Sequence, residues 1–213
     1  MRAFILAAAA AILALPATAQ QTTMQSAAGS GKLPDNWMAR VDRDAPASSV
    51  KFDKMGDGWH VAPGNAAVYW RDADKASGNY HATVKLTQTK SPMHPEGYGL
   101  VVGGSDLAGA AQKYTYFLVR GDGRFLIKKR DGASTTNVNE GWTENAAINK
   151  ADANGKATNT LAIGVKGGKV SFTVNDKEVY NTDAASVNTD GNVGVRVNHN
   201  LDVHIADFAV HKS

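Results

Sequence analysis

The sequence contains no cysteine, which excludes disulfide bonds, thiolate metal sites and cysteine nucleophiles. Only 6 of its 213 residues are proline, too few for a polyproline or collagen-like chain. Beyond residue 15, no apolar run approaches the roughly 20 residues of a membrane-spanning helix. Its 23 basic and 20 acidic side chains are mixed in sign, which argues against nucleic acid as a partner. These absences predict a folded domain that depends on its hydrophobic core.

The amino-terminal segment carries the three parts of an export signal. Arg2 supplies a short positive start, residues 3–15 are uninterruptedly apolar, and residues 17–19 read Ala-Thr-Ala, a typical cleavage pattern. We therefore expect residues 1–19 to be a signal peptide, followed by a flexible polar leader at 20–32. The protein is then exported to the periplasm or the extracellular space, without a membrane span.

From Leu33 onward the dominant periodicity is two, as in β-strands with one buried face. Apolar and polar residues alternate over 80–87, 161–165, 170–174 and 193–197. Gly167-Gly168 and Asn175-Asp176 separate neighbouring runs and predict two consecutive hairpins.

Three further runs refine this picture. The runs 98–102 and 114–119 are apolar at odd-numbered and even-numbered positions alike, which is typical of central strands covered on both faces. In the last run, 201–210, the apolar residues change from odd-numbered to even-numbered positions near Ala206, and this change predicts a β-bulge. We predict an all-β protein, with a single antiparallel β-sandwich of the jelly-roll type over residues 33–213.

Four strand-and-turn segments carry a resemblance to a known superfamily. They are Gly-Trp-His-Val at 58–61, Glu-Gly-Tyr-Gly-Leu-Val-Val-Gly-Gly at 96–104, Val-Ser-Phe-Thr-Val-Asn-Asp at 170–176 and the closing stretch 191–210. Together they resemble the concanavalin-like lectin/glucanase superfamily, including its laminin-G-like and 3-keto-disaccharide hydrolase-type domains. The resemblance implies a curved sandwich whose concave sheet can hold a sugar.

The function expected from this resemblance is carbohydrate or glycan binding by an exported module. Two alternatives stay open: a glycoside-cleaving enzyme of the 3-keto-disaccharide hydrolase type, and a structural envelope protein without a small ligand. Fold-level resemblance does not choose among them, because one fold serves many functions. The oligomeric state and the identity of the glycan are also left open.

The acidic residues argue against one kind of enzyme. Retaining glucanases of the superfamily use a Glu-x-Asp-x-x-Glu strand, and such hydrolysis requires two carboxyl groups about 5–5.5 Å apart. This spacing is absent, because Glu96, Glu140, Glu144 and Glu178 are scattered among turns and strand ends. If the protein is a hydrolase or lyase acting on glycosides, His60 and Glu96 are the best candidates for a general acid or base. A structural role for His60 is the alternative.

Aromatic and basic residues form the stronger candidate for ligand binding. Tyr rings offer faces for sugar C–H groups, while Arg, Lys and Asn side chains donate hydrogen bonds to hydroxyl or carboxylate groups. The alternative is that the aromatic residues fill the core and the charges form a solvated face. The candidate ligand-binding residues are Tyr69, Tyr98, Tyr114, Tyr116, Arg120, Lys128, Arg130, Trp142, Arg196 and Asn198.

No cofactor is required by the pattern, but one segment concentrates side chains that can bind a divalent metal ion. Asp202 and His204 share one face of a predicted strand, and His199 can reach them from the preceding turn. Two imidazoles and a carboxylate are typical ligands of zinc and similar ions. The alternative is a turn at 198–200 followed by the solvent face of a final strand.

Overall fold

A computed structural model describes residues 33–45 and 49–212. The predicted signal peptide and leader lie outside the described residues, so both stay predictions. Among the described residues the structure consists of fifteen strands, with 3₁₀ turns at Asp42–Asp44 (η1) and Ala184–Ser186 (η3). No helix in this part of the chain is long and apolar enough to cross a membrane. The predicted all-β class is therefore confirmed.

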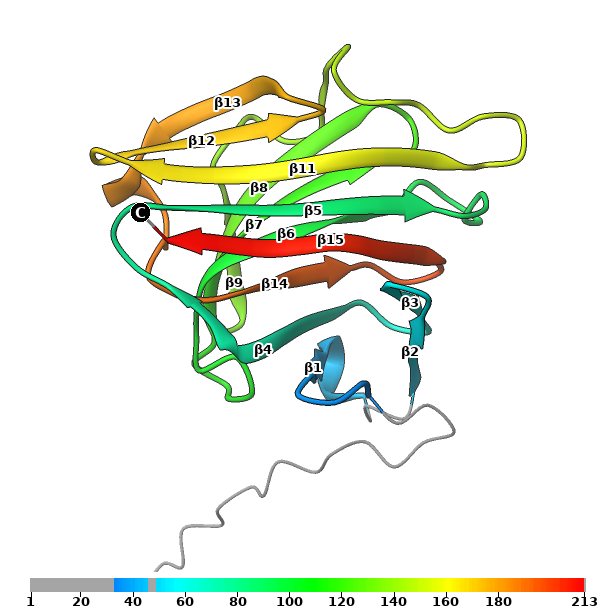
Figure 1. Cartoon of the computed structure of the whole chain (residues 1–213), viewed down its shortest axis with the longest axis horizontal. Coiled ribbons are helices and arrows are strands. Elements are labelled where there is room, and N and C mark those ends of the chain that lie inside the picture. Colours follow the sequence, from blue (N-terminus) through cyan, green and yellow to red (C-terminus); the bar gives the residue numbers. More distant parts are fainter. Residues whose placement is uncertain (1–32, 46–48, 213) are drawn as a thin grey trace, which may run out of the picture.

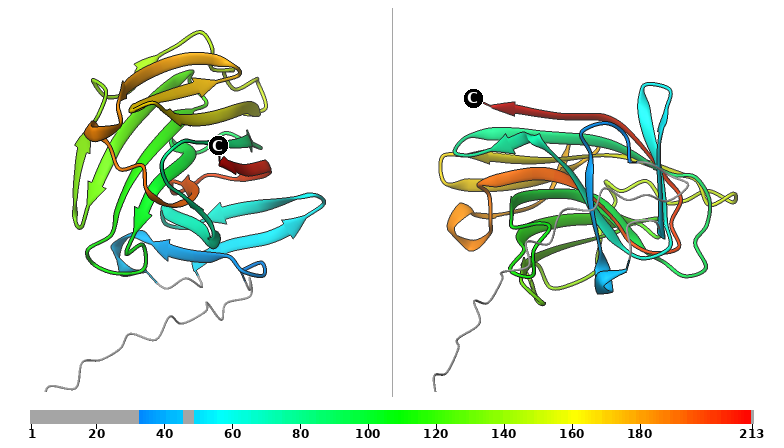
Figure 2. Two further views of the ribbon diagram at one scale, coloured as in Figure 1. Left: turned by 60° about the vertical axis from the view of Figure 1, so that its left-hand side comes forward. Right: turned by 90° about the horizontal axis from the view of Figure 1, so that it is seen from below.

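The strands form two antiparallel sheets (Figures 1 and 2). The eight-stranded sheet, here called sheet A, has the order β1 (Met38–Val41), β4 (Ala67–Ala76), β14 (Gly191–Val197), β6 (Gly97–Ser105), β7 (Lys113–Arg120), β8 (Arg124–Asp131) and β10 (Thr143–Glu144), with β9 (Ser134–Asn137) also paired to β8. The seven-stranded sheet, sheet B, has the order β13 (Lys177–Asp183), β12 (Lys169–Val174), β11 (Ala157–Lys166), β5 (Tyr80–Gln88), β15 (Val203–Lys212), β3 (Gly58–Pro63) and β2 (Val50–Met55).

The core lies between the sheets and draws on both of them. Phe117 of sheet A meets Phe172 of sheet B edge to face, with ring centroids 5.4 Å apart. Strand β5 shows why the alternating pattern produces this arrangement, because its apolar residues Tyr80, Ala82, Val84 and Leu86 are all buried on one side. One continuous cluster of buried residues joins the sheets, so the molecule is a two-layer sandwich as predicted.

The two predicted hairpins are present as β11–β12 and β12–β13. Gly167 and Gly168 connect the first, and Asn175 and Asp176 connect the second, all four with positive φ. This backbone matches the twist of paired strands and favours Gly, Asn and Asp. The predicted bulge is also confirmed, because the β15–β5 register shifts between Ala206 and Ala209, where Asp207 has a φ of 51°.

Strands β6 and β7 lie in the middle of sheet A and are covered on both faces, as expected from their continuous apolar runs. Residues that point inward join the main core. Those that point outward form a second cluster of buried residues, which contains Val68, Trp70, Val101, Leu107, Tyr114, Tyr116 and Leu118. This second cluster places large side chains on the outer face of sheet A.

Candidate functional site

The outer face of sheet A gathers several predicted ligand-binding residues. Tyr114 and Tyr116 project from β7, Lys128 and Arg130 from β8, and Arg196 from β14. In the sheet register, Tyr116 lies opposite Lys128 and Tyr114 lies opposite Arg130. Arg196 reaches the same place, because its guanidinium lies 5.5 Å from the centre of the Tyr116 ring. Five side chains predicted to act together are therefore neighbours.

Arg196 is the anchor of this face. Its side chain is only 9% exposed, and its Nη2 lies 2.5 Å from Oδ2 of Asp42 in η1. Its Nη1 donates to Asp42 Oδ1 and to the Tyr114 hydroxyl, each at 3.3 Å. Burial works to lower the pKa of Arg196, but Tyr114 and Asp42 outweigh it and raise that pKa above its ordinary value. The guanidinium is therefore a fixed positive charge.

The two tyrosines form the aromatic part of the face. Their ring centroids are 5.6 Å apart, and Tyr116 retains 7% exposure while Tyr114 is fully covered. Burial raises the pKa of both phenols, against the lowering effect of Arg196. Both hydroxyls are therefore neutral at physiological pH and can donate or accept a hydrogen bond.

Lys128 and Arg130 add charge that the face does not neutralise. Both side chains are partly exposed, and neither pairs with a carboxylate among the described residues. The Nε atom of Arg130 is buried without a hydrogen-bond partner. An unpaired buried donor costs free energy, so this part of the side chain is held at a cost to stability.

Trp142 and Arg120 lie at one end of the same face. The Arg120 guanidinium sits 4.4 Å from the centre of the Trp142 ring and is paired with Asp122. Gly97 makes room for the indole, because a β-carbon at this position would lie 2.7 Å from the ring. These two predicted residues therefore extend the aromatic and basic face toward the beginning of β6.

Two other predicted residues, Tyr69 and Tyr98, do not contribute to this face. Tyr69 and Tyr98 have the opposite parity and are fully buried in the core between the sheets, so a ligand on the outer face cannot touch them. This corrects the expectation for both, and the reason is that strand alternation directs them inward. Asn198 donates its Nδ2 to Glu96 Oε2 at 3.1 Å, at the end of β14.

The candidate catalytic residues are engaged with different partners. His60 lies on β3 of sheet B, where its Nε2 is 3.0 Å from Asp202 Oδ1. Glu96 precedes β6 of sheet A and contacts His94 and His199. Within the part of the chain that the structure describes, the two residues therefore belong to separate groups.

The three predicted metal ligands are likewise divided. Asp202 interacts with His60 and Lys90, and His204 lies opposite His60 in the β3–β15 register. His199 instead joins His94 and Glu96, and one ligand atom from each of these three lies within 4.8 Å of the others. This group could hold a metal ion. Our sequence reasoning missed His94, although the His-Pro-Glu spacing at 94–96 is a usable signal, and it missed Asp42.

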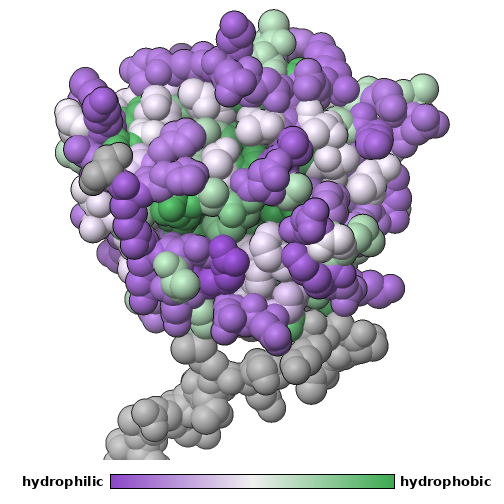
Figure 3. All heavy atoms as spheres, viewed as in Figure 1, coloured by the Kyte–Doolittle hydropathy of each residue, from purple (hydrophilic) through white to green (hydrophobic). Residues whose placement is uncertain are grey.

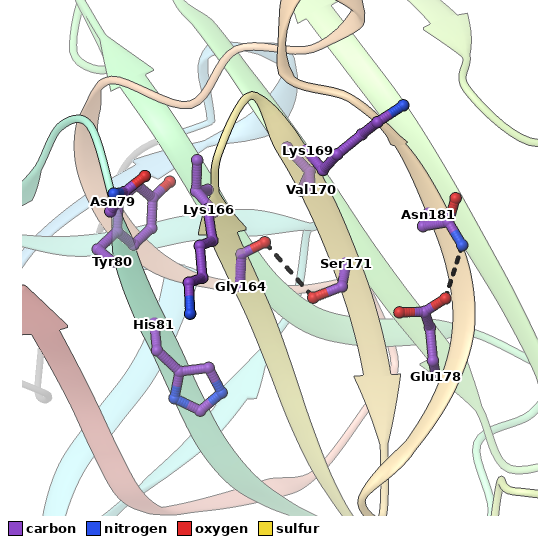
Figure 4. A pocket seen from close by; sticks show the side chains of 11 residues that line it. Asn79, Tyr80, His81, Gly164, Lys166, Lys169, Val170, Ser171, Glu178 and Asn181 are labelled. Carbon is purple, nitrogen blue, oxygen red and sulfur yellow. Dashed lines mark hydrogen bonds between the residues drawn. The ribbon is translucent and has the colours of Figure 1, made fainter. Parts of the chain in front are cut away.

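A cavity of about 560 Å³ lies elsewhere, on the outer face of sheet B. Figure 3 views the molecule from that side, and hydrophilic residues cover most of the surface. Lys166, Ser171, Glu178 and Asn181 are among the lining residues, and Figure 4 shows Asn181 donating to Glu178. The predicted aromatic and basic residues are not among its lining residues.

Similarity to solved structures decides the fold. The carbohydrate-binding module CBM66 from Bacillus subtilis matches with a TM-score of 0.62 and 11% identity, over 83% of this chain and 95% of that chain. A protein of unknown function with a galectin-like fold, also from Bacillus subtilis, matches with a TM-score of 0.59 and 14% identity, over 83% and 89%. The chain has a concanavalin-like jelly-roll fold.

Further comparisons agree with this assignment of the concanavalin-like fold. The Bacillus licheniformis β-glucanase matches with a TM-score of 0.54 and 8% identity, over 83% of this chain and 92% of that chain. No protein-family profile matches the sequence, and no curated protein does. At these identities the similarity shows the fold alone, and this fold occurs in both carbohydrate-binding modules and glycoside-cleaving enzymes.

Proposed function

We propose that this protein binds a carbohydrate on the outer face of sheet A, and that the preferred ligand carries acidic groups. The observation that carries the proposal is the convergence of Tyr116 and Arg196 with Lys128 and Arg130. The last two lack carboxylate partners among the described residues, whereas Asp42 already balances Arg196. A uronic acid supplies the missing negative charge, and its ring presents hydroxyl groups to the same donors.

The roles of the side chains follow from their positions. Arg196 and Asp42 hold the floor of the site rigid. Lys128 and Arg130 receive the sugar carboxylate, since both are partly exposed. Trp142 is half-buried at the end of the face, where its ring can contact the C–H groups of a neighbouring sugar unit. A mixture of aromatic walls and a few polar groups is typical of ligand sites.

The proposal is tested by calorimetric titration with matched neutral and uronic-acid oligosaccharides. We expect the acidic ligands to bind more tightly, with an affinity that falls as salt is added. Lys128→Gln and Arg130→Gln should each weaken binding about fivefold, because a partly exposed ion pair contributes up to about 1 kcal/mol. Lys129→Gln is the matched control, since it removes the same charge from the opposite face of β8.

Three outcomes contradict the proposal as a whole. One is that neither oligosaccharide class binds, and another is that Lys129→Gln weakens binding as much as Lys128→Gln. The third is steady cleavage of a glycoside that His60→Gln or Glu96→Gln abolishes, which would favour the glycoside-cleaving alternative instead. Equal affinity for neutral and acidic ligands would retain carbohydrate binding but remove the preference for charge.

We also propose that this activity is exercised outside the cytoplasm. The support is the pattern of residues 1–19, with its positive start, apolar run and Ala-Thr-Ala ending. Intact-mass spectrometry of the protein recovered from its native cells should give a chain that begins at Gln20. Recovery of the uncleaved chain from the cytoplasm would contradict this proposal.

A further inference from the structure

The paired ends of β6 and β14 bring three metal-binding side chains together. Tyr98 lies opposite Val197, and the Asn198 N–H donates to the Gly97 carbonyl at 3.0 Å. Antiparallel pairing continued by one step therefore places Glu96 opposite His199. His94 stands two residues before Glu96. Glu96 therefore has His199 as its neighbour on the adjacent strand and His94 as its neighbour two residues earlier in the chain.

The distances show how closely these groups converge. Glu96 Oε1 lies 3.1 Å from His94 Nδ1 and 3.1 Å from His199 Nε2. The two imidazole rings are 5.1 Å apart between centroids, at an interplanar angle of 62°. The rings therefore do not stack face to face, and each directs one nitrogen to the same carboxylate oxygen.

We propose that His94, Glu96 and His199 form a binding site for a divalent transition-metal ion of the zinc class. Imidazole nitrogen and a single carboxylate are ligands preferred by such ions, whereas calcium and magnesium require more oxygen ligands than this group supplies. The three ligand atoms lie within 4.8 Å of one another, so small rotations of the side chains suffice to surround an ion. This proposal does not depend on carbohydrate binding.

The surroundings of Glu96 favour a defined site. Its side chain is 13% exposed, and Asn198 donates to its Oε2, which leaves Oε1 directed toward the histidines. Hydrogen bonds of this kind orient metal ligands in proteins. Asn200 lies beside the group, with its side-chain Nδ2 3.4 Å from His94 Nε2, the nitrogen on the far side of the ring.

Exposure of the histidines indicates the kind of site. The His94 side chain is 51% exposed and that of His199 is 42% exposed, so water can reach an ion held between them. Three protein ligands and an accessible fourth position are typical of open metal sites rather than closed structural ones. The ion would therefore be exchangeable and able to accept a further ligand.

The second histidine and aspartate group on the molecule is less suitable. Asp202 accepts a hydrogen bond from Thr89 and lies 3.1 Å from the Lys90 ammonium. This positive charge competes with a metal ion for the carboxylate. Glu96, in contrast, has only histidines as ion-pair partners among the described residues. The geometry therefore selects His94, Glu96 and His199.

The test is calorimetric titration of the full chain, without an added polyhistidine tag, with zinc chloride. We expect one saturable site per chain, and a thermal unfolding midpoint that rises with zinc concentration. Cobalt(II) in place of zinc should give a visible absorption spectrum of the bound ion. Glu96→Gln and His199→Gln should each weaken zinc binding about tenfold or more. His211→Gln is the matched control, because His211 is exposed on β15 away from the group.

Circular dichroism shows whether each variant is folded, and His94→Gln provides a further folded variant if one of the others is not. Loss of binding in His60→Gln together with full binding in His199→Gln would overturn the proposal, because the ion would then occupy the other group. It is also overturned if the wild-type chain shows no saturable site, or if zinc binds the Glu96 and His199 variants as tightly as the wild type. Calcium or magnesium competing equally with zinc would contradict the assigned ion class.

Discussion

At the scale of single residues, Arg196 is the most constrained charge on the outer face of sheet A. Its side chain is 9% exposed, and Asp42 from η1 supplies the compensating charge at 2.5 Å. Removal of one partner from such a pair leaves the other charge without compensation, which costs more than the pair itself contributes. Asp42 therefore has a structural role that depends on its charge.

The variant Asp42→Asn keeps the shape of the side chain and removes this charge. We expect it to lower the free energy of unfolding by about 2 kcal/mol, the scale of a hydrogen bond to a charged group. Urea denaturation measures the change. Asp53→Asn is the matched control, because Asp53 is exposed on β2. Equal stability of the two variants would show that Asp42 does not compensate Arg196.

Asp202 gives a prediction about pH. Burial acts to raise the pKa of its carboxyl group, but hydrogen bonds from Thr89 and Lys90 and the charge of His60 lower it below the ordinary value overall. A carboxyl group with a lowered pKa in the folded state stabilises the protein above its unfolded pKa, near 3.9. That contribution is lost as the pH falls through the folded value.

The variant Asp202→Asn tests this linkage. At pH 7 it should lower the free energy of unfolding by about 1–2 kcal/mol, because a charge-assisted hydrogen bond is lost. The difference from the wild type should shrink below about pH 4, where the wild-type carboxyl group also takes up a proton. Urea denaturation at pH 7, 5 and 3 measures it. A difference that is unchanged at pH 3 would assign the loss to packing rather than to charge.

At the scale of elements, two glycines show different reasons for the absence of a side chain. Gly168 lies in the β11–β12 turn with a φ of +76° and open space around it, whereas a β-carbon at Gly99 in β6 would lie 1.9 Å from the Phe117 carbonyl oxygen. Gly168→Ala should therefore cost about 1 kcal/mol through backbone strain alone. Gly99→Ala should cost about 3 kcal/mol, because backbone at the centre of sheet A must move. Thermal and urea unfolding of both variants measure the contrast, and equal losses would contradict it.

Some strands of the sandwich can be predicted from the local sequence pattern, and others cannot. The β11–β12–β13 hairpins follow from alternation and from turn residues that adopt positive φ, both of which are local properties. Strands β9 and β10 are different. They have 4 and 2 residues and no buried side chains, and they pair along the edge of β8. Tertiary pairing, not a local hydrophobic pattern, defines these two strands.

At the scale of the whole molecule, the chain's crossing between sheets decides which side chains meet. His199 and Asp202 are three residues apart in the segment that connects β14 of sheet A to β15 of sheet B, with His199 near the end of β14 and Asp202 next to the start of β15. His199 therefore contacts Glu96, which lies 103 positions earlier in the chain, while Asp202 contacts His60. Alternation gives the side of its own strand on which each of Tyr116, Lys128 and Arg196 lies. Only the strand order β14, β6, β7 and β8 in one sheet brings the three onto a common face.

The shared core predicts that the two sheets unfold together. Phe117 and Phe172 are both fully buried and pack edge to face across the sandwich. Aromatic pairs of this kind contribute about 0.5–1.5 kcal/mol beyond the area that they bury. Phe117→Leu and Phe172→Leu should each destabilise the protein, and the double variant should lose about 1 kcal/mol less than the sum of the single losses.

Circular dichroism and tryptophan fluorescence should follow the same unfolding transition in every variant, because the core belongs to both sheets. Phe52→Leu combined with Phe172→Leu is the control, since Phe52 packs edge to face against Trp37 and Tyr69 instead of Phe172. Those two losses should be additive. Separate transitions for the two probes would mean that one sheet can persist without the other. The continuous core makes a single transition the expected result, because neither sheet can bury its inner face alone.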